Sequence, residues 1–251
     1  MKDIIAVVLA AGQGTRMGSE EKKLPKVMFE LAGRPIVRHN LDNLKNAGVS
    51  DIVVVVGYEK EKVINYFGDE VEYAEQFERL GTGHAVAMAK ENVKDKAKWL
   101  LVCYGDMPLF QPATIKKLIE EVEEKQPTVG MLTVNFDDPE FWAYGRIVRS
   151  EDGDIEKIVE QKDCSPEELK IKECNPSFFI FENNWFWENI VKLSTANAQK
   201  EYYLTDMIGL ATDQKKKIIG MPVGEEWEAL GINNPDQLKE AEEILRKISN
   251  S

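Results

Sequence analysis

The feature that most constrains this chain is a short apolar run that leads directly into a glycine loop. Ile4 to Leu9 are β-branched or aliphatic residues with one alanine, and Gly12 and Gly14 follow them. Such a run predicts a parallel strand buried on both faces. The loop then leaves the carboxyl end of the strand, where open α/β sheets bind ligands. Because glycines let backbone N–H groups approach phosphate oxygens closely, the sequence predicts a phosphate site.

Two basic residues flank this loop and supply the positive charge that a triphosphate requires, namely Arg16 and Lys26. A dinucleotide fingerprint is disfavoured, because glycines 12, 14 and 18 are spaced one residue too far apart and the next predicted strand ends without an acid for a ribose. A Walker A loop is excluded, since no Gly-Lys-Ser/Thr follows. A tight turn with solvated basic residues is the alternative.

The remaining pattern is that of an α/β protein. Strands are predicted at 51–56, 71–74 and 99–104, with helices at 36–47, 83–92 and 112–124, which indicates a parallel sheet. A lid-like antiparallel section is predicted from strands at 129–135, 145–149, 155–160 and 174–181. Helices at 185–193, 204–212 and 235–248 and a strand at 217–221 follow. We predict one domain over 1–251, a Rossmann-like mixed sheet, mainly parallel and flanked by helices.

Composition narrows the possible partners. The net charge is −12 over 251 residues, which argues against a general nucleic-acid or anionic-membrane binder. The three cysteines have no metal-binding spacing, and we interpret them as reduced thiols. The apolar stretches are too short for a signal peptide or a membrane span, so we expect a cytoplasmic protein.

A carboxylate follows the predicted strand 99–104. Asp106 therefore lies at the same edge of the sheet as the glycine loop. Mg²⁺ takes few protein oxygens and completes its shell with phosphates and water, so Asp106 and the amide oxygen of Asn233 would suffice to hold it. The alternative role of Asp106 is that of a helix cap or a turn residue, and the alternative role of Asn233 is that of a plain turn residue.

Short motifs occur in order along nearly the whole chain: LAAGQGTRM at 9–17, PKV at 25–27, LAGRP at 31–35, Gln76, LGTGHA at 80–85, YGD at 104–106, YGRI at 144–147, IVEQKD at 158–163, NAQKEYYLTD at 197–206 and GINN at 231–234. Together they resemble the uridylyltransferase domain of the bacterial bifunctional enzyme that makes UDP-N-acetylglucosamine. That domain belongs to the sugar nucleotidyltransferases. The resemblance implies the nucleotide-diphospho-sugar transferase fold, with a nucleotide-binding half at 1–110, a sugar-binding half at 111–225 and a metal-binding turn and C-terminal helix at 226–251.

The resemblance also implies a role for each matching position. Arg16 and Lys26 would hold the triphosphate and act in catalysis with Asp106, and Asp106 and Asn233 would bind Mg²⁺. The residues that would bind the uracil and ribose are Leu9, Ala10, Ala11, Gly12, Gly14, Gln76, Gly81 and Thr82. Those that would bind the sugar are Tyr104, Gly145, Glu160 and Asn175. His84, Tyr202, Tyr203 and Cys103 are expected to be packing residues outside the site.

The implied reaction transfers UMP from UTP to a sugar-1-phosphate, most simply N-acetylglucosamine-1-phosphate, and needs no general base because the attacking oxygen is already anionic. Where the family usually reads Asn-Thr-Gly, this chain reads Asn175-Pro176-Ser177. The identity of the sugar therefore stays open, and another hexose-1-phosphate is an alternative substrate. Two further alternatives are dTTP as the nucleotide and a catalytically silent regulator that binds a nucleotide-sugar. The β-helix acetyltransferase domain of the family has no counterpart in the sequence, so acetyl transfer is not expected and the oligomeric state stays open.

Overall fold

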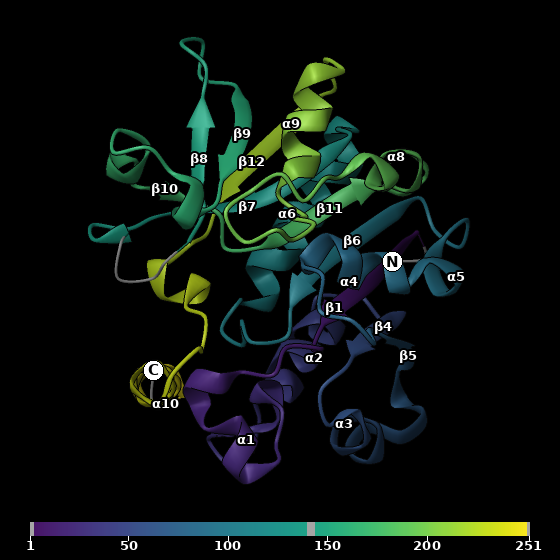
Figure 1. The fold of residues 1–251 in the computed structure, drawn as a ribbon, viewed down its shortest axis with the longest axis vertical. Helices are drawn as coiled ribbons and strands as arrows, with labels where there is room; N and C mark the ends of the chain where they lie inside the picture. The colour runs from purple at the N-terminus through teal and green to yellow at the C-terminus, as the bar shows by residue number, and fades with distance from the viewer. Residues whose placement is uncertain (1–2, 140–143, 250–251) are drawn as a thin grey trace.

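The fold is a three-layer α/β arrangement built around one twisted sheet (Figure 1). The computed structural model describes residues 3–139 and 144–249. Within these residues ten strands form the sheet, in the order β5-β4-β1-β6-β11-β7-β10-β8-β9, and β12 pairs with β7. Among these residues no helix has both the length and the apolar character needed to cross a membrane.

The first part of the sheet is parallel, as predicted. Strands β1 (Ile4–Leu9), β4 (Ile52–Val56), β5 (Glu72–Glu75) and β6 (Trp99–Tyr104) run in the same direction, with β1 between β4 and β6. Successive side chains of a strand point to opposite faces. Ile4 and Val8 accordingly pack into one core and Ile5 and Val7 into another, which is why the run is apolar throughout.

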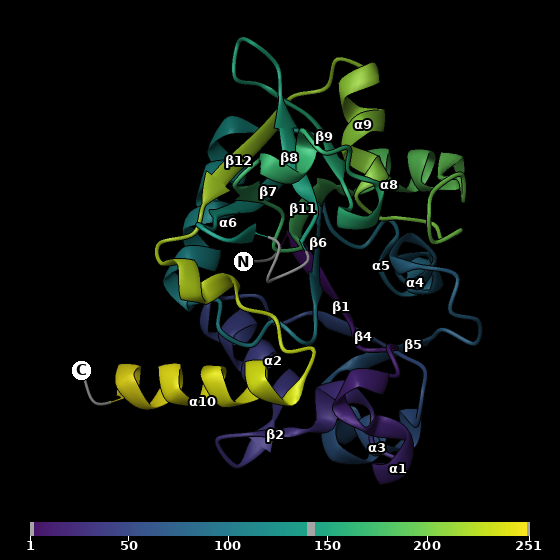
Figure 2. The ribbon, with the colours of Figure 1, turned by 60° about the vertical axis from the view of Figure 1, so that its left-hand side comes forward.

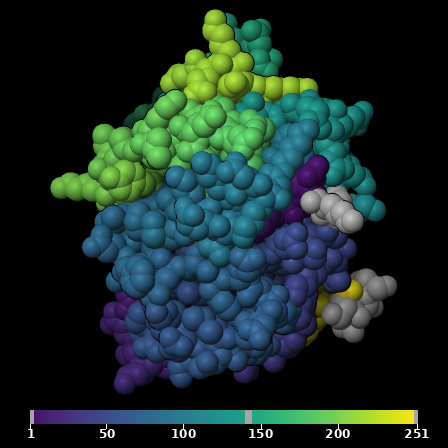
Figure 3. Space-filling view, turned by 90° about the vertical axis from the view of Figure 1, so that its right-hand side faces the viewer, coloured from purple at the N-terminus to yellow at the C-terminus, as the bar shows by residue number. Residues whose placement is uncertain are grey.

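Helices cover both faces of the sheet (Figures 1 and 2). One core contains residues of α2 (Ile36–Asn46), α3 (Lys60–Phe67), α6 (Pro112–Lys125) and α10 (Pro235–Ser249). The opposite core contains residues of α4 (Thr82–Met88), α5 (Lys90–Val93), α8 (Asn183–Asn189) and α9 (Asp206–Asp213). Figure 3 shows the blue N-terminal part of the surface directly against the green segment that contains α8.

The second part of the sheet is mostly antiparallel. Its strands are β7 (Val129–Asn135), β8 (Arg146–Arg149), β9 (Ile155–Val159), β10 (Glu173–Cys174), β11 (Phe178–Glu182) and β12 (Ile218–Pro222), the last parallel to β7. Because β11 pairs with both β6 and β7, the two parts share one sheet. The fold class predicted from the sequence is confirmed.

Several predicted elements differ in detail. The strand predicted at 174–181 is two strands, because Pro176 has no N–H to donate and Ser177 adopts a left-handed φ of 59° between them. The helix predicted at 83–92 divides into α4 and α5 at Ala89. Helix α3, the short α1 (Ser19–Lys22) and the hairpin of β2 (Glu30–Leu31) with β3 (Arg34–Pro35) were not predicted.

Candidate active site

The carboxyl ends of the central strands bring the glycine loop beside Asp106. Leu9 pairs with Tyr104 across β1 and β6. The N–H of Ala10 donates to the carbonyl of Val55 at 2.9 Å, and the N–H of Gly105 donates to the carbonyl of Leu9 at 2.9 Å. These bonds continue the sheet beyond the strand ends, so the two loops that leave β1 and β6 are held side by side.

Gly14 packs against the residue that provides the first charge of the site. Its φ is 74°, and a Cβ at this position would collide with the Cβ of Lys26. The Ser19 hydroxyl donates to the Gly14 carbonyl at 2.9 Å and fixes the turn. Only glycine satisfies both the left-handed backbone and this close approach. Gly14 thus seats Lys26, which begins the short helix η2 (Lys26–Met28).

Lys26 joins the two residues that the sequence predicted as metal ligands. Its ammonium group forms an ion pair with Oδ2 of Asp106 and donates to Oδ1 of Asn233 at 2.8 Å. The other carboxylate oxygen of Asp106, Oδ1, is buried and has no hydrogen-bond partner among the described residues. Carboxylate and amide oxygens are the ligands that Mg²⁺ prefers, and an unpartnered buried carboxylate oxygen can take a ligand. The residues present therefore fit a magnesium ion.

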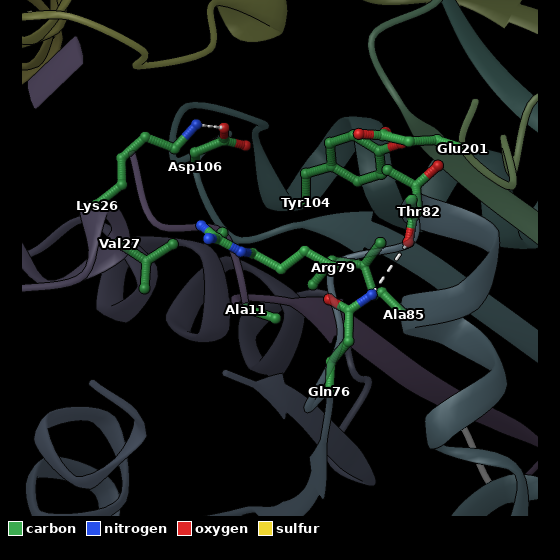
Figure 4. Close-up of a pocket in the computed structure, with 13 residues that line it drawn as sticks. Ala11, Lys26, Val27, Gln76, Arg79, Thr82, Ala85, Tyr104, Asp106 and Glu201 are labelled. Carbon is green, nitrogen blue, oxygen red and sulfur yellow. Dashed lines mark hydrogen bonds and ion pairs between the residues drawn. The ribbon is translucent and has the colours of Figure 1, made fainter. Parts of the chain in front are cut away.

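A small cavity of about 210 Å³ lies between the glycine loop and α4 (Figure 4). Of the residues predicted to bind the nucleotide, those that line it are Leu9, Ala11, Gly12, Gln76, Gly81 and Thr82. Ala10 is buried behind the loop, and Gly14 faces Lys26 rather than this cavity. The glycine loop therefore forms one wall of a cavity and is more than a surface turn.

The amide of Gln76 has a defined orientation in this cavity. Its Nε2 donates to the Gly81 carbonyl at 3.2 Å and to Nδ1 of His84 at 3.1 Å. Both amide hydrogens are then used, which leaves the carbonyl oxygen as the group that faces a ligand. His84, expected to be only a packing residue, holds this orientation. The Thr82 hydroxyl accepts a hydrogen bond from the N–H of Leu204 at 3.0 Å.

A larger cavity of about 550 Å³ adjoins the first. The four residues predicted to bind the sugar all line it, as do Arg16 and Asn233: Tyr104, Gly145, Glu160 and Asn175. The residues that line both cavities are Lys26, Thr82, Tyr104, Asp106 and Glu201. Figure 4 shows Lys26 and Asp106 pointing toward each other on one side of this junction, with Tyr104 and Thr82 on the other.

Glu160 brings an unusual carboxylate to the larger cavity. Burial raises the pKa of its side chain, and the nearby carboxylates of Asp206 and Asp163 raise it further. The hydroxyl of Thr205 donates to Oε1 of Glu160 at 2.8 Å and opposes these effects. Glu160 is thus held in one orientation by a single described partner, and its other oxygen stays available for a ligand.

The segment at Asn175 departs from the family pattern and has its own geometry. The N–H of Ser177 donates to Oδ1 of Asn175 at 3.0 Å, which leaves the amide NH₂ of Asn175 as its free group. Burial raises the pKa of Tyr104, and hydrogen bonds with the side chains of Thr82 and Ser177 oppose that shift. Ser177 therefore contacts Tyr104 through a side chain that the family's glycine lacks.

Sequence reasoning missed several residues that line the two cavities. Arg79 runs across the smaller cavity, and its Nη1 donates to Oε1 of Gln13 (Figure 4). Tyr203, expected to be a packing residue, lines the larger cavity and its hydroxyl donates to Asp163 at 3.2 Å. Glu201 and Tyr203 lie in the motif at 197–206, which was the available signal. Arg79 lies in none of the motifs.

Three comparisons with known proteins bear on this site. The sequence model of one family, the MobA-like NTP transferase domain, matches residues 6–160. The chain is 42% identical over 247 residues to the bifunctional protein GlmU of Brevibacillus brevis, covering 98% of this chain and 52% of the relative. It is 44% identical over 246 residues to the protein of the same name from Clostridium beijerinckii, again covering 98% and 52%. The chain thus spans about half the length of these relatives.

A solved structure shares the fold. It is described as UDP-glucose pyrophosphorylase complexed with UDP-glucose, and it superposes with a TM-score of 0.80 over 98% of this chain and 99% of that chain. The two sequences are 18% identical, so the likeness is one of architecture.

Proposed function

The chain belongs to the family of MobA-like NTP transferase domains, and from that premise we propose that it transfers UMP from UTP to a sugar-1-phosphate. The resemblance noted in the sequence implies a sugar-1-phosphate as the acceptor, and two relatives of 42% and 44% identity, both named bifunctional protein GlmU, agree with that resemblance. UTP would occupy the smaller cavity and the sugar-1-phosphate the larger one. The products are a UDP-sugar and pyrophosphate.

The observation that carries this proposal is the junction of the two cavities. Lys26 and Asp106 line both, between the glycine loop on one side and the pair Glu160 and Asn175 on the other. A nucleotide bound on the glycine loop and a sugar bound at Glu160 would therefore present their phosphates to the same place. Holding two reactants in this way removes most of the entropic barrier to their reaction, on the order of 7–11 kcal/mol in favourable cases.

The reaction needs little more than alignment and charge. A phosphate oxygen of the sugar-1-phosphate attacks the α-phosphorus of UTP, and the bond from that phosphorus to the oxygen bridging to the β-phosphate breaks. The electron pair leaves with pyrophosphate. Lys26 and Arg16 provide positive charge to the triphosphate as this negative charge develops. When bound at Asp106 and Asn233, Mg²⁺ would neutralise further phosphate charge.

The orientation of Gln76 supports uracil as the base. With both amide hydrogens used by Gly81 and His84, Gln76 offers an acceptor oxygen to the ligand. Uracil and thymine carry an N–H at ring position 3, which can donate to that oxygen, whereas cytosine and adenine present unprotonated ring nitrogens. Guanine has a ring N–H too. However, this chain reads Leu-Ala-Ala-Gly at 9–12, with Ala11 at the position where the pattern of the molybdopterin guanylyltransferases, Leu-Ala-Gly-Gly, has a glycine.

We propose N-acetylglucosamine-1-phosphate as the sugar substrate, used less well than in relatives with Asn-Thr-Gly. The amide NH₂ of Asn175 is a donor that suits a carbonyl oxygen such as that of an N-acetyl group. Ser177 adds a side chain to the same wall, where glycine would leave space. The preference for this sugar over other hexose-1-phosphates is therefore reduced.

Pyrophosphate release tests the proposal. The protein is mixed with Mg²⁺, N-acetylglucosamine-1-phosphate and, in turn, UTP, dTTP, CTP, ATP and GTP. We expect release with UTP, with or without dTTP, and at least about tenfold slower release with CTP and ATP, because an unprotonated ring nitrogen would replace uracil N3–H opposite the Gln76 oxygen. Equal rates with UTP and CTP would contradict the assignment of the base. Release that does not depend on the sugar phosphate would contradict the transfer.

A further inference from the structure

The hydroxyl of Tyr144 lies where three segments distant in sequence come together. It accepts a hydrogen bond from the N–H of Gly231 at 2.7 Å and donates to the carbonyl of Ala229 at 2.8 Å. It also lies 3.6 Å from the sulfur of Met107, the residue that follows Asp106. One phenolic oxygen thus connects the loop after β6 with the turn that precedes Asn233.

The turn at Gly231 is packed tightly on this hydroxyl. A Cβ on Gly231 would lie 2.8 Å from Tyr144 Oη and 2.7 Å from Met107 Sδ, so a side chain there would displace one of these two atoms. The next N–H, that of Ile232, donates to the backbone carbonyl of Asp106 at 2.9 Å. Asn233 therefore follows directly on a turn that is fixed to Tyr144 and to Asp106.

A buried arginine contacts the backbone of Tyr144. Arg146 is fully buried, and its Nη1 donates to the backbone carbonyl of Tyr144. The Nε and Nη2 of Arg146 have no hydrogen-bond partner among the described residues. The bond from Arg146 therefore helps to fix the backbone of Tyr144.

We propose that Tyr144 is a positioning residue that holds the side chain of Asn233 beside Asp106, so that the two oxygens can bind one cation. This inference rests on the proposed function, in which Asp106 and Asn233 receive Mg²⁺. Tyr144 acts through the turn and needs no contact with substrate. Residues that orient metal ligands in this way typically change metal affinity by about 10- to 100-fold when they are replaced.

The test compares Tyr144→Phe with Tyr73→Phe. Tyr73 also donates its hydroxyl to a backbone carbonyl, that of Gly68 at 2.8 Å, but outside the candidate site. Mn²⁺ binding in the presence of UTP is measured by electron paramagnetic resonance, and the Mg²⁺ concentration for half-maximal rate is measured separately. For Tyr144→Phe we expect at least about tenfold weaker Mn²⁺ binding, a matching rise in the Mg²⁺ requirement, and kcat restored at saturating Mg²⁺. Tyr73→Phe should match the wild type.

A double-mutant cycle separates positioning from general loss of structure. In the background of Asn233→Ala the Tyr144→Phe change should add no further loss of Mn²⁺ affinity, because the residue that it positions is gone. An unchanged Mn²⁺ affinity in Tyr144→Phe, or an equal loss in both backgrounds, would overturn the proposal. If the wild type binds no Mn²⁺ with UTP, the proposed function fails. If the wild type binds Mn²⁺ and Tyr144→Phe binds it equally well, the positioning role fails and the proposed function stands.

Discussion

The ammonium group of Lys26 donates a hydrogen bond to Oδ1 of Asn233 at 2.8 Å, across a separation of 207 residues. The same ammonium pairs with Asp106. One positive charge therefore contacts both residues that we assign to Mg²⁺, so lysine and metal compete for Oδ1 of Asn233 and for the negative charge of Asp106. A nucleotide that draws Lys26 toward its phosphates would end this competition when the metal binds.

Replacing Lys26 tests this competition. In Lys26→Met the positive charge is lost while the length of the side chain is roughly kept. We expect Mn²⁺ to bind the nucleotide-free variant more tightly than the nucleotide-free wild type, and we expect kcat to fall because charge-assisted bonds to the leaving pyrophosphate are lost.

Arg16→Ala is the matched comparison for Lys26→Met. Arg16 is exposed and lines the larger cavity, and it is not among the residues that bond to Asp106 or Asn233 in the described part of the structure. Turnover should slow here too, while Mn²⁺ binding to the free protein stays at the wild-type value. Equal Mn²⁺ affinity in Lys26→Met and the wild type would argue against competition between lysine and metal. A change confined to the KM for the sugar phosphate would mean that Lys26 and Arg16 bind the sugar phosphate rather than the triphosphate.

Removing the charge of Asp106 should abolish most turnover. Asp106→Asn keeps the shape of the side chain but loses a carboxylate that we assign to the metal, and we expect kcat to fall by about 10²- to 10³-fold, equivalent to several kcal/mol of charge stabilisation. The melting temperature should change little. Asp42→Asn is the control, since Asp42 pairs with Arg34 and Arg38 away from the cavities. A kcat of Asp106→Asn equal to that of the wild type would contradict the assignment of Asp106 to the metal site.

Because the pKa of Glu160 is raised, we expect its ionised form to lower the stability of the fold while it supports activity. The folded state binds a proton more tightly than the unfolded state, so this group favours folding below the ordinary carboxyl pKa and loses that contribution as pH rises through its raised pKa. At pH 7 to 8 we expect Glu160→Gln to melt at a higher temperature than the wild type, with the difference shrinking toward pH 4.

The activity of the same variant should move the other way. An ionised Glu160 accepts hydrogen bonds from sugar hydroxyls, so kcat/KM for the sugar phosphate should fall as pH drops through the raised pKa, and Glu160→Gln should lack that step. Glu70→Gln provides the opposite control for stability, because ion pairs with Lys45 and Arg38 lower the pKa of Glu70. A lower melting temperature for Glu160→Gln at neutral pH would contradict this account.

The departure at Pro176 and Ser177 predicts a change in sugar preference. Ser177→Gly, alone or with Pro176→Thr, should raise kcat/KM for N-acetylglucosamine-1-phosphate relative to glucose-1-phosphate, because it opens the wall beside Asn175. Ser177→Gly also removes a left-handed serine, a strain of about 1–2 kcal/mol that the greater freedom of glycine in the unfolded chain offsets. Its melting temperature should therefore stay close to that of the wild type. If the ratio of kcat/KM for the two sugar phosphates is unchanged and the wild type is highly active on the N-acetylated sugar, Pro176 and Ser177 have no effect on sugar preference.

Local patterns were sufficient for the parts of the fold that depend on neighbouring residues. The run Ile4–Leu9 and the glycines after it predicted the buried strand and the position of the loop, since each depends on side chains close in sequence. The resemblance placed Tyr104, Glu160 and Asn175 in one group, and they do line one cavity. Their roles stay predictions.

Contacts between distant segments escaped the sequence analysis. The bond from Arg79 to Gln13 and the junction at Tyr144 depend on how loops from different strands meet, which no periodicity reports. The division of the strand at 174–181 was foreseeable from Pro176, whose missing N–H interrupts the ladder. The left-handed Ser177 was not, because serine rarely adopts that conformation.

The most direct test of the account follows both products of one reaction. Phosphorus NMR is recorded on UTP, N-acetylglucosamine-1-phosphate and Mg²⁺ with the wild-type protein and with Asp106→Asn. We predict that the wild type forms UDP-N-acetylglucosamine and pyrophosphate in equal amounts, and that Asp106→Asn forms both at least about 100-fold more slowly. UTP binding without either product, as for a silent regulator, or UMP and pyrophosphate without a UDP-sugar, would contradict the transfer of UMP at the junction of the two cavities.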